Sequence, residues 1–213
     1  MDTGKLIVIE GLDGTGKTTQ LQLLAAHLRA QGKTVHTDAE PTGGETGKLL
    51  RRVLSGEVPC SPWATAALFL ADRIEHNTRS ETGILQRLQA GHTVLTDRYY
   101  YSTLAYQGLD TDVDWVLDMH RRCPVVRTPD LVLYLHMSPE KCMERIRKNR
   151  PEEDLEIFET TETLTAVGER FDAVFSRLKE TENIVPIDAD GSIEAVAARI
   201  AEAADRIFTE DAR

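Results

Sequence analysis

The segment Gly11-Leu12-Asp13-Gly14-Thr15-Gly16-Lys17-Thr18 decides the fold of this chain. It follows an apolar, β-branched run from Lys5 to Glu10 and precedes a helical pattern from Lys17 to Gln31. Its spacing matches GxxxxGK[ST], a loop whose backbone N–H groups point at phosphate oxygens. In such a loop the lysine reaches the β- and γ-phosphates, and the next hydroxyl ligates Mg²⁺. The segment therefore predicts a nucleoside triphosphate site in which Lys17 and Thr18 have these roles.

The rest of the chain alternates strand-like and helix-like segments. Further strands are predicted at 34–40, 92–97, 130–137 and 183–188, and helical patterns at about 46–55, 62–90 (opening at Ser61-Pro62), from 139 and from 192. Near-continuous apolar residues, as in Leu131 to Leu135, indicate strands buried on both faces. We predict an α/β protein, a three-layer P-loop NTPase fold with a five-stranded parallel sheet flanked by helices. Its ligands should bind at the carboxyl ends of the strands.

Composition excludes several classes of protein. Of 213 residues, 41% are hydrophobic, which argues against disorder, and the net charge of −10 disfavours a coat for a nucleic-acid polymer. No stretch approaches the ~20 apolar residues that span a bilayer. The three cysteines are odd in number and widely spaced, which supports neither a disulfide framework nor a zinc site. We therefore expect a cytoplasmic protein that has neither a membrane nor a nucleic acid as partner.

A carboxylate and a cation end the strand predicted at 92–97. Its apolar residues run into Asp97, as expected for an acidic group beside Mg²⁺, and Arg98 follows at once. Such a pair is often only a salt-bridged strand end, but beside a phosphate loop Arg98 is well placed for a second phosphate. The chain has no NKxD or TKxD motif, which weighs against a GTPase.

Two further pairs of side chains have the spacing of a base-binding site. Phe69 and Arg73 lie four residues apart on one face of a predicted helix, so they can stack on a base and donate to its edge. Thr103 and Tyr106, three residues apart, either line a pocket or simply pack. Taken alone, both pairs are more often ordinary core and surface.

Together these segments resemble the thymidylate kinase family of nucleoside monophosphate kinases. The resemblance covers about residues 5 to 205, and its matching segments are 9–20, Glu40-Pro41 with Leu50-Arg51, 68–73, 97–99 with 102–108, and Ile187-Asp188-Ala189. It implies transfer of the γ-phosphate of ATP to dTMP, giving dTDP and ADP on the way to dTTP, with Mg²⁺. It also implies a homodimer and a cis peptide at Glu40-Pro41. Residues 1–213 would then form one P-loop kinase domain with a short lid at about 145–157.

The resemblance also implies the roles of residues around the acceptor nucleoside. Phe69 would stack on thymine, Arg73 would donate to its O4, and Thr103 would read another edge. Asp13 would hold the sugar 3′-hydroxyl. Tyr106 would fill the space beneath C2′, so that ribonucleotides fit badly.

Around the phosphates, the resemblance implies that Arg51 and Arg98 grip the acceptor monophosphate. Asp97 would organise the magnesium side of the reaction together with Thr18, and Ala189 would lie beside the adenine. One departure is Thr42, which stands where many relatives carry Gly.

The family supplies a catalytic arginine either in the P-loop or in a mobile lid. Here Gly14 follows the P-loop aspartate, so the lid must provide it. The lid contains a basic run, Arg145, Arg147, Lys148 and Arg150. Arg147 and Arg150 are the candidates because the helix should break beside them, whereas the other two fit a solvated helix end favoured by the dipole. The segment lacks the common Asp-Arg-x-Glu pattern, reading Asn-Arg-Pro-Glu-Glu-Asp at 149–154.

Two alternatives remain open. The first is a kinase of another nucleoside monophosphate or of a deoxynucleoside, although the only carboxylate at the end of the first strand, Glu10, precedes the loop. The second is a nucleotide-dependent switch without an acceptor. The arginines at 51, 73 and 98 argue against a switch, because they suggest an acceptor site.

Overall fold

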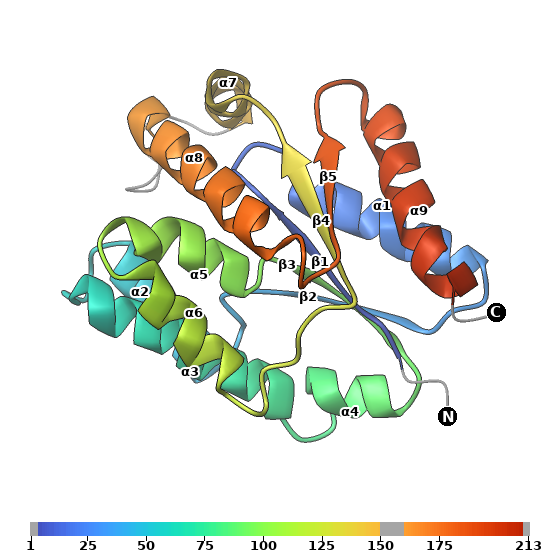
Figure 1. The fold of residues 1–213 in the computed structure, drawn as a ribbon, viewed down its shortest axis with the longest axis horizontal. Helices are drawn as coiled ribbons and strands as arrows, with labels where there is room; N and C mark the ends of the chain where they lie inside the picture. Colours follow the sequence, from blue (N-terminus) through green and yellow to red (C-terminus); the bar gives the residue numbers. More distant parts are fainter. Residues whose placement is uncertain (1–3, 150–159, 211–213) are drawn as a thin grey trace.

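The computed structural model describes residues 4–149 and 160–210 of the 213-residue chain (Figure 1). The strands of this part are β1 (Leu6–Gly11), β2 (Val35–Ala39), β3 (Thr93–Asp97), β4 (Leu131–His136) and β5 (Ile184–Asp188). Its α-helices are α1 (Lys17–Ala30), α2 (Glu45–Leu54), α3 (Pro62–Thr78), α4 (Ile84–Gln89), α5 (Tyr100–Tyr106), α6 (Val113–Arg121), α7 (Pro139–Asn149), α8 (Thr161–Leu178) and α9 (Ile193–Glu210). A short 3₁₀ helix, η1 (Gln107–Leu109), follows α5.

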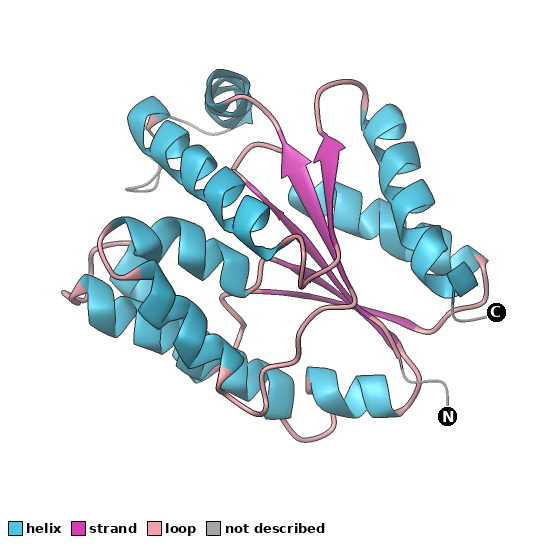
Figure 2. Cartoon of the chain, in the orientation of Figure 1, coloured by secondary structure: helices cyan, strands magenta, loops and turns pink. Residues whose placement is uncertain are grey.

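The five strands form one parallel sheet in the order β2-β3-β1-β4-β5. Helices α1 and α9 cover one face, and α5 and α8 lie on the other, with α2, α3 and α6 outside α5 (Figure 2). The sheet is buried on both faces, since every residue of β1 and the five residues Leu131 to Leu135 of β4 are buried. The predicted three-layer α/β fold with a five-stranded parallel sheet is confirmed.

The predicted helix over 62–90 is wrong in its length. Ser61 caps it as expected, accepting from the Ala64 N–H at 3.3 Å, but α3 ends at Thr78 and α4 is separate. Between them Glu81 adopts a left-handed φ of 68°, and Gly83 packs so tightly that a Cβ there would lie 2.5 Å from the Arg79 carbonyl oxygen. The sequence carries a sign of this turn, because residues 75–83 contain no apolar residue and end at Gly83.

The carboxyl ends of the central strands gather the residues that the sequence singled out. β1 leads directly into the phosphate loop and α1, while Ile9 of β1 pairs in register with Asp97 at the end of β3. β2 ends beside them at Ala39, and the Glu40-Pro41 peptide that follows is cis, as the resemblance implied. In the described residues no helix has the length and apolar character needed to cross a membrane.

Candidate active site

The phosphate loop folds around the side chain of Lys17. The Lys17 ammonium donates to the carbonyl oxygen of Leu12 at 2.9 Å and lies 3.5 Å from Asp13 Oδ1. Gly14 has a φ of 85°, and a Cβ there would lie 2.5 Å from the carbonyl oxygen of Cys142, so a glycine is required. Burial and the nearby Arg98 lower the pKa of Lys17, whereas Asp13 opposes this shift. The lysine is thus held inside the loop at the floor of a cleft.

This cleft, which we call the phosphate cleft, has a volume of about 410 Å³. Its lining includes Lys17, Thr18, Asp97, Arg98 and Arg145. Three of these five side chains are cationic and the other two can hold a cation, which suits a site for phosphate groups and Mg²⁺.

Thr18 and Asp97 form an oxygen pair that fits Mg²⁺. The Thr18 hydroxyl donates to Asp97 Oδ2 at 2.7 Å, which joins the start of α1 to the end of β3. Mg²⁺ prefers oxygen ligands and usually takes only one or two from the protein, the others being water and phosphate oxygens. The described residues contain no group of three or more His, Cys, Asp or Glu able to hold a metal.

Arg98 crosses the phosphate cleft from β3 to the phosphate loop. Its Nη2 donates to Asp13 Oδ1 at 2.6 Å and to the Tyr106 hydroxyl at 3.3 Å, and that hydroxyl donates to Asp13 Oδ2 at 3.0 Å. Burial would raise the pKa of Asp13, but the cations of Arg98 and Lys17 hold it well below its usual range. The predicted residues Asp13, Arg98 and Tyr106 therefore lie together, and Asp13 stays ionised.

Arg98 has a left-handed backbone with a φ of 70°, which is uncommon for a residue other than glycine. Glu10, fully buried at the end of β1, stabilises this turn by accepting from the N–H groups of Tyr99 and Ser102 at 2.8 and 3.1 Å. The Ser102 hydroxyl donates to Glu10 Oε2 and accepts from Arg98 Nη1, both at 2.7 Å. Sequence reasoning missed this role of Glu10, because its partners lie about ninety residues away.

Burial raises the pKa of Glu10, although the nearby Arg98 and the hydrogen bonds from the Ser102 hydroxyl and the Tyr99 N–H oppose this shift. The Glu10 carboxylate accepts three hydrogen bonds from this turn, one from Tyr99 and two from Ser102. Glu10 is therefore a buried carboxylate that stabilises the turn at Arg98.

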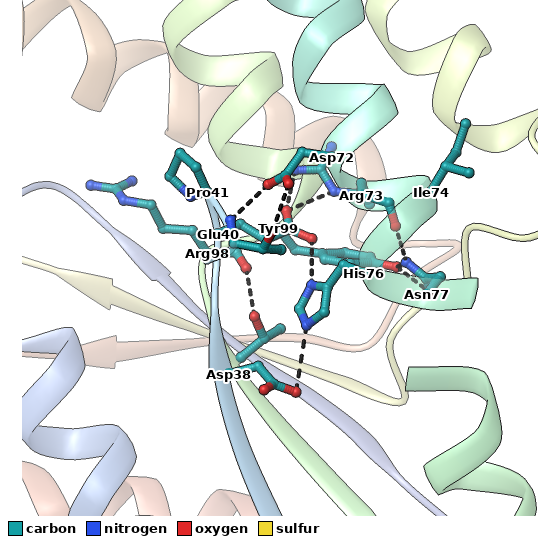
Figure 3. A network of polar contacts seen from close by, with 12 residues as sticks. Asp38, Glu40, Pro41, Asp72, Arg73, Ile74, His76, Asn77, Arg98 and Tyr99 are labelled. Carbon is teal, nitrogen blue, oxygen red and sulfur yellow. Dashed lines mark hydrogen bonds and ion pairs between the residues drawn. The ribbon is translucent and has the colours of Figure 1, made fainter. Parts of the chain in front are cut away.

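The residues expected to read the base converge on Arg73 of α3. The Arg73 guanidinium is 1% exposed and donates to Glu40 Oε2 through Nε at 2.9 Å and Nη2 at 2.5 Å. Thr103 Oγ1 lies 3.4 Å from both Nη atoms, so two residues that were each expected to read the base lie together. Phe69 lies one turn before Arg73 on the same helix and is half-buried. Figure 3 shows Arg73, Glu40 and His76 pointing toward one another.

Arg51 lies beside the phosphate cleft. It donates to the carbonyl oxygens of Pro41 and Thr42 at 2.5 and 2.6 Å, and it lines an adjoining cavity that shares Thr18 and Asp97 with the cleft. Thr42, the departure from the family pattern, donates through its N–H and hydroxyl to buried Asp72 at 2.7 and 2.6 Å. Thr42 therefore ties the loop that follows β2 to α3.

Residues 145–149 of the predicted lid lie within the described part of the chain. Arg145 of α7 is half-buried and lines the phosphate cleft, whereas Arg147 is exposed and is absent from that lining. Arg150 lies outside the described residues, as does the predicted lid beyond 149. Ala189, expected beside the adenine, is buried just after β5, and its N–H donates to the His136 carbonyl at 2.9 Å.

Helical spacing alone does not separate the two arginines. Cys142, Met143 and Ile146 are apolar and form the buried side of α7. At about 100° per residue, Arg145 and Arg147 flank this side at similar angles, one on each edge. The edge that carries Arg145 is the one that lines the phosphate cleft, which only the packing of α7 beside the phosphate loop decides.

A phosphate loop, an oxygen pair for Mg²⁺ and a second group of cations around one cleft define a P-loop phosphotransferase. The family model described as "Thymidylate kinase" matches residues 9–200. The chain therefore belongs to the thymidylate kinase family, which confirms the resemblance.

Individual relatives agree with the family model. The chain is 36% identical over 197 residues to a putative thymidylate kinase of Treponema pallidum (strain Nichols), covering 91% of each chain. It is 41% identical over 172 residues to a thymidylate kinase of Desulfotalea psychrophila (strain LSv54 / DSM 12343), covering 80% of this chain and 82% of that one. It is 35% identical over 208 residues to a thymidylate kinase of Prochlorococcus marinus (strain MIT 9303), covering 93% and 92%.

Proposed function

We propose that this chain transfers the γ-phosphoryl group of ATP to dTMP, giving dTDP and ADP. One observation carries this proposal: Lys17 of the phosphate loop and Arg98, a second phosphate-binding cation, line the same cleft with Thr18 and Asp97. Two phosphate-binding groups facing one metal site are what transfer between two phosphates requires. A switch that only binds a nucleotide has no need of the second group.

On the donor side, the N–H groups of the phosphate loop and the helix N-terminus would bind the ATP phosphates. Lys17 would exchange the Leu12 carbonyl for a phosphate oxygen, which is a stronger partner for an ammonium. Thr18 and Asp97 would hold Mg²⁺, which neutralises phosphate charge when bound. Ala189, just after β5, would lie beside the adenine.

On the acceptor side, Arg98 would bind the dTMP phosphate, oriented by Ser102. Asp13 is ionised and accepts from the Tyr106 hydroxyl, so it can also accept from a sugar 3′-hydroxyl. The Tyr106 ring, also beside Asp13, would fill the space beneath C2′. A smaller cavity of about 160 Å³ lies against Tyr106, between α2, the start of α3 and η1.

For the base, Phe69 would stack on thymine while Arg73 and Thr103 read its edge. Arg51, which lines the cavity adjoining the phosphate cleft, would support the acceptor phosphate. Arg145 is the lid cation that the geometry favours for the transferring phosphoryl group, with Arg147 and Arg150 as the alternatives. Residues 1–213 would act as one kinase domain with a lid at about 145–157.

The cellular setting is part of the proposal. Cys60, Cys123 and Cys142 are all free thiols, in keeping with the reducing cytoplasm.

A homodimer is supported by an aromatic patch in which exposed Trp63 of α3 and Trp115 of α6 pack with ring centroids 5.1 Å apart. Light scattering on a size-exclusion column tests the dimer.

The function is tested by assaying ADP release with ATP and a panel of monophosphates. We expect dTMP to be preferred and dUMP to be slower, because one methyl group in an apolar site is worth only ~1–3 kcal/mol. Chelation of Mg²⁺ should abolish turnover. Equal rates with dCMP or dGMP would exclude a thymine site, and turnover of thymidine in place of dTMP would support the deoxynucleoside alternative.

A further inference from the structure

Arg73 is held on three sides before any ligand is bound. Glu40 accepts two of its N–H bonds, and the ring of Tyr99 lies 5.0 Å below its guanidinium carbon. A third partner is His120 of α6, whose Nε2 lies 2.5 Å from Arg73 Nη1. His120 is 1% exposed, and no motif of the sequence pointed to it.

The chemistry of this contact determines the state of His120. A guanidinium has only donors, so His120 Nε2 must accept and must carry no proton. His120 Nδ1 lies 2.7 Å from the Val116 carbonyl oxygen, which only accepts, so Nδ1 must carry the proton. Burial and the positive charge of Arg73 lower the pKa of His120 to about 3. The imidazole is therefore neutral, with a single tautomer, throughout the physiological pH range.

Within residues 4–149 and 160–210, the remaining donors of Arg73 have no strong partner. Of its five N–H bonds, two go to Glu40 and one goes to His120. The last two, one on each Nη atom, meet only the single oxygen of the Thr103 hydroxyl, at 3.4 Å. These two parallel donors are thus available for an acceptor oxygen on a ligand that lies beside Thr103.

We propose that His120 is a positioning residue for base selection. By accepting one N–H of Arg73, it fixes the guanidinium so that the two N–H bonds beside Thr103 face a carbonyl oxygen of the acceptor base. This inference rests on the proposed function. Thymine and uracil present a carbonyl oxygen at position 4, whereas cytosine presents an amino group that itself donates. An arginine fixed in this way therefore selects the first two bases and disfavours cytosine.

Two substitutions separate this role from a structural one. His120→Phe keeps a buried ring but removes the acceptor, whereas His120→Gln keeps an acceptor oxygen close to the position of Nε2. Leu117→Ala is the matched control, because Leu117 is a buried apolar residue of the same helix and its side chain cannot accept a hydrogen bond from Arg73. For each variant, kcat and KM are measured with dTMP, dCMP and ATP.

We expect His120→Phe to raise KM for dTMP about tenfold, with kcat and KM for ATP within about threefold of wild type. Its preference for dTMP over dCMP should fall by a similar factor, and His120→Gln should retain most of that preference. Leu117→Ala should lower thermal stability without changing the preference. An unchanged preference in His120→Phe, or an equal loss of preference in Leu117→Ala, overturns the proposal.

A second measurement does not depend on the substrate. ¹⁵N NMR of the histidine side chains should show a neutral imidazole protonated at Nδ1 for His120 between pH 5 and 8, and the signal should be absent in His120→Gln. A protonated ring, or the Nε2–H tautomer, overturns the contact with Arg73 directly. If instead wild type prefers another monophosphate while the NMR result holds, the proposed function fails and the positioning of Arg73 by His120 stands.

Discussion

Arg145 and Arg147 lie two residues apart on α7, yet Arg145 lines the phosphate cleft and Arg147 is exposed to solvent. The two arginines flank the buried side of α7 on opposite edges, and the docking of α7 against Gly14 of the phosphate loop places the edge with Arg145 at the cleft. Arg145 and Arg147 have the same side chain and lie on the same helix, so substituting each in turn tests which one acts on phosphate.

Arg145→Ala should lower kcat by about 10²-fold or more, since a cation over the transferring phosphoryl group is worth ~10³–10⁵ in well-studied nucleotide hydrolases. Its dTMP affinity, measured by calorimetry, should change little. Arg147→Ala should stay within about twofold of wild type. A normal kcat in Arg145→Ala would exclude this residue and leave Arg150→Ala as the variant to examine.

Lys17→Ala should reduce phosphoryl transfer by orders of magnitude, because Lys17 neutralises charge on the transferring group. The fold should persist, because the substitution removes a buried cation whose pKa is already lowered by burial. Stopped-flow turnover and circular dichroism are measured together. A folded Lys17→Ala protein that turns over normally would show that the phosphate loop does not act as proposed.

Tyr106 contributes both a ring and a hydroxyl. Tyr106→Phe removes the hydrogen bond to Asp13, worth about 0.5–1.5 kcal/mol, and should raise KM for dTMP several-fold without admitting ribonucleotides. Tyr106→Ala should admit a ribose 2′-hydroxyl and lower the preference for dTMP over its ribo analogue. The measurement is the ratio of kcat/KM for dTMP to kcat/KM for the ribo analogue, in wild type and in both variants. An unchanged preference in Tyr106→Ala places sugar discrimination elsewhere.

Two buried histidines should make stability depend on pH in opposite directions. Burial lowers the pKa of His76, but hydrogen bonds to Asp38 and Glu40 outweigh it and raise that pKa to about 9. A folded pKa above the unfolded value of about 6.5 stabilises the protein fully below pH 6.5, and this contribution is lost as the pH rises toward 9. His76→Gln should therefore flatten the decline in the free energy of unfolding over this range.

For His120 the sign is reversed, because its folded pKa is lowered to about 3. The neutral ring stabilises the folded state above pH 6.5, and this contribution is lost as the pH falls toward 3. Urea unfolding of wild type and His120→Gln from pH 4 to 7 measures the difference. Parallel curves for the two proteins over that range would contradict the contact with Arg73.

Much of the fold was predictable from short stretches of sequence. The phosphate loop from Gly11 to Thr18 carries its own chemistry, because its glycines and its lysine act within eight consecutive residues. The apolar run of β4 indicated a strand buried on both faces for the same local reason. Asp97 and Arg98 were found because the end of a parallel strand beside such a loop is itself a signal.

The partners of the site residues depended on tertiary structure. Glu40 and His120 meet Arg73 across 33 and 47 residues of sequence, and Glu10 meets Ser102 across 92. No local sequence pattern predicts these contacts, because they depend on how α3, α5 and α6 pack against the strand ends. The sequence by itself determined which chemistry this protein carries and at which edge of the sheet it lies. The packing of helices on that sheet decided which cation faces the cleft, which carboxylate is structural, and which histidine stays neutral, because burial and charged neighbours are properties of the folded chain alone.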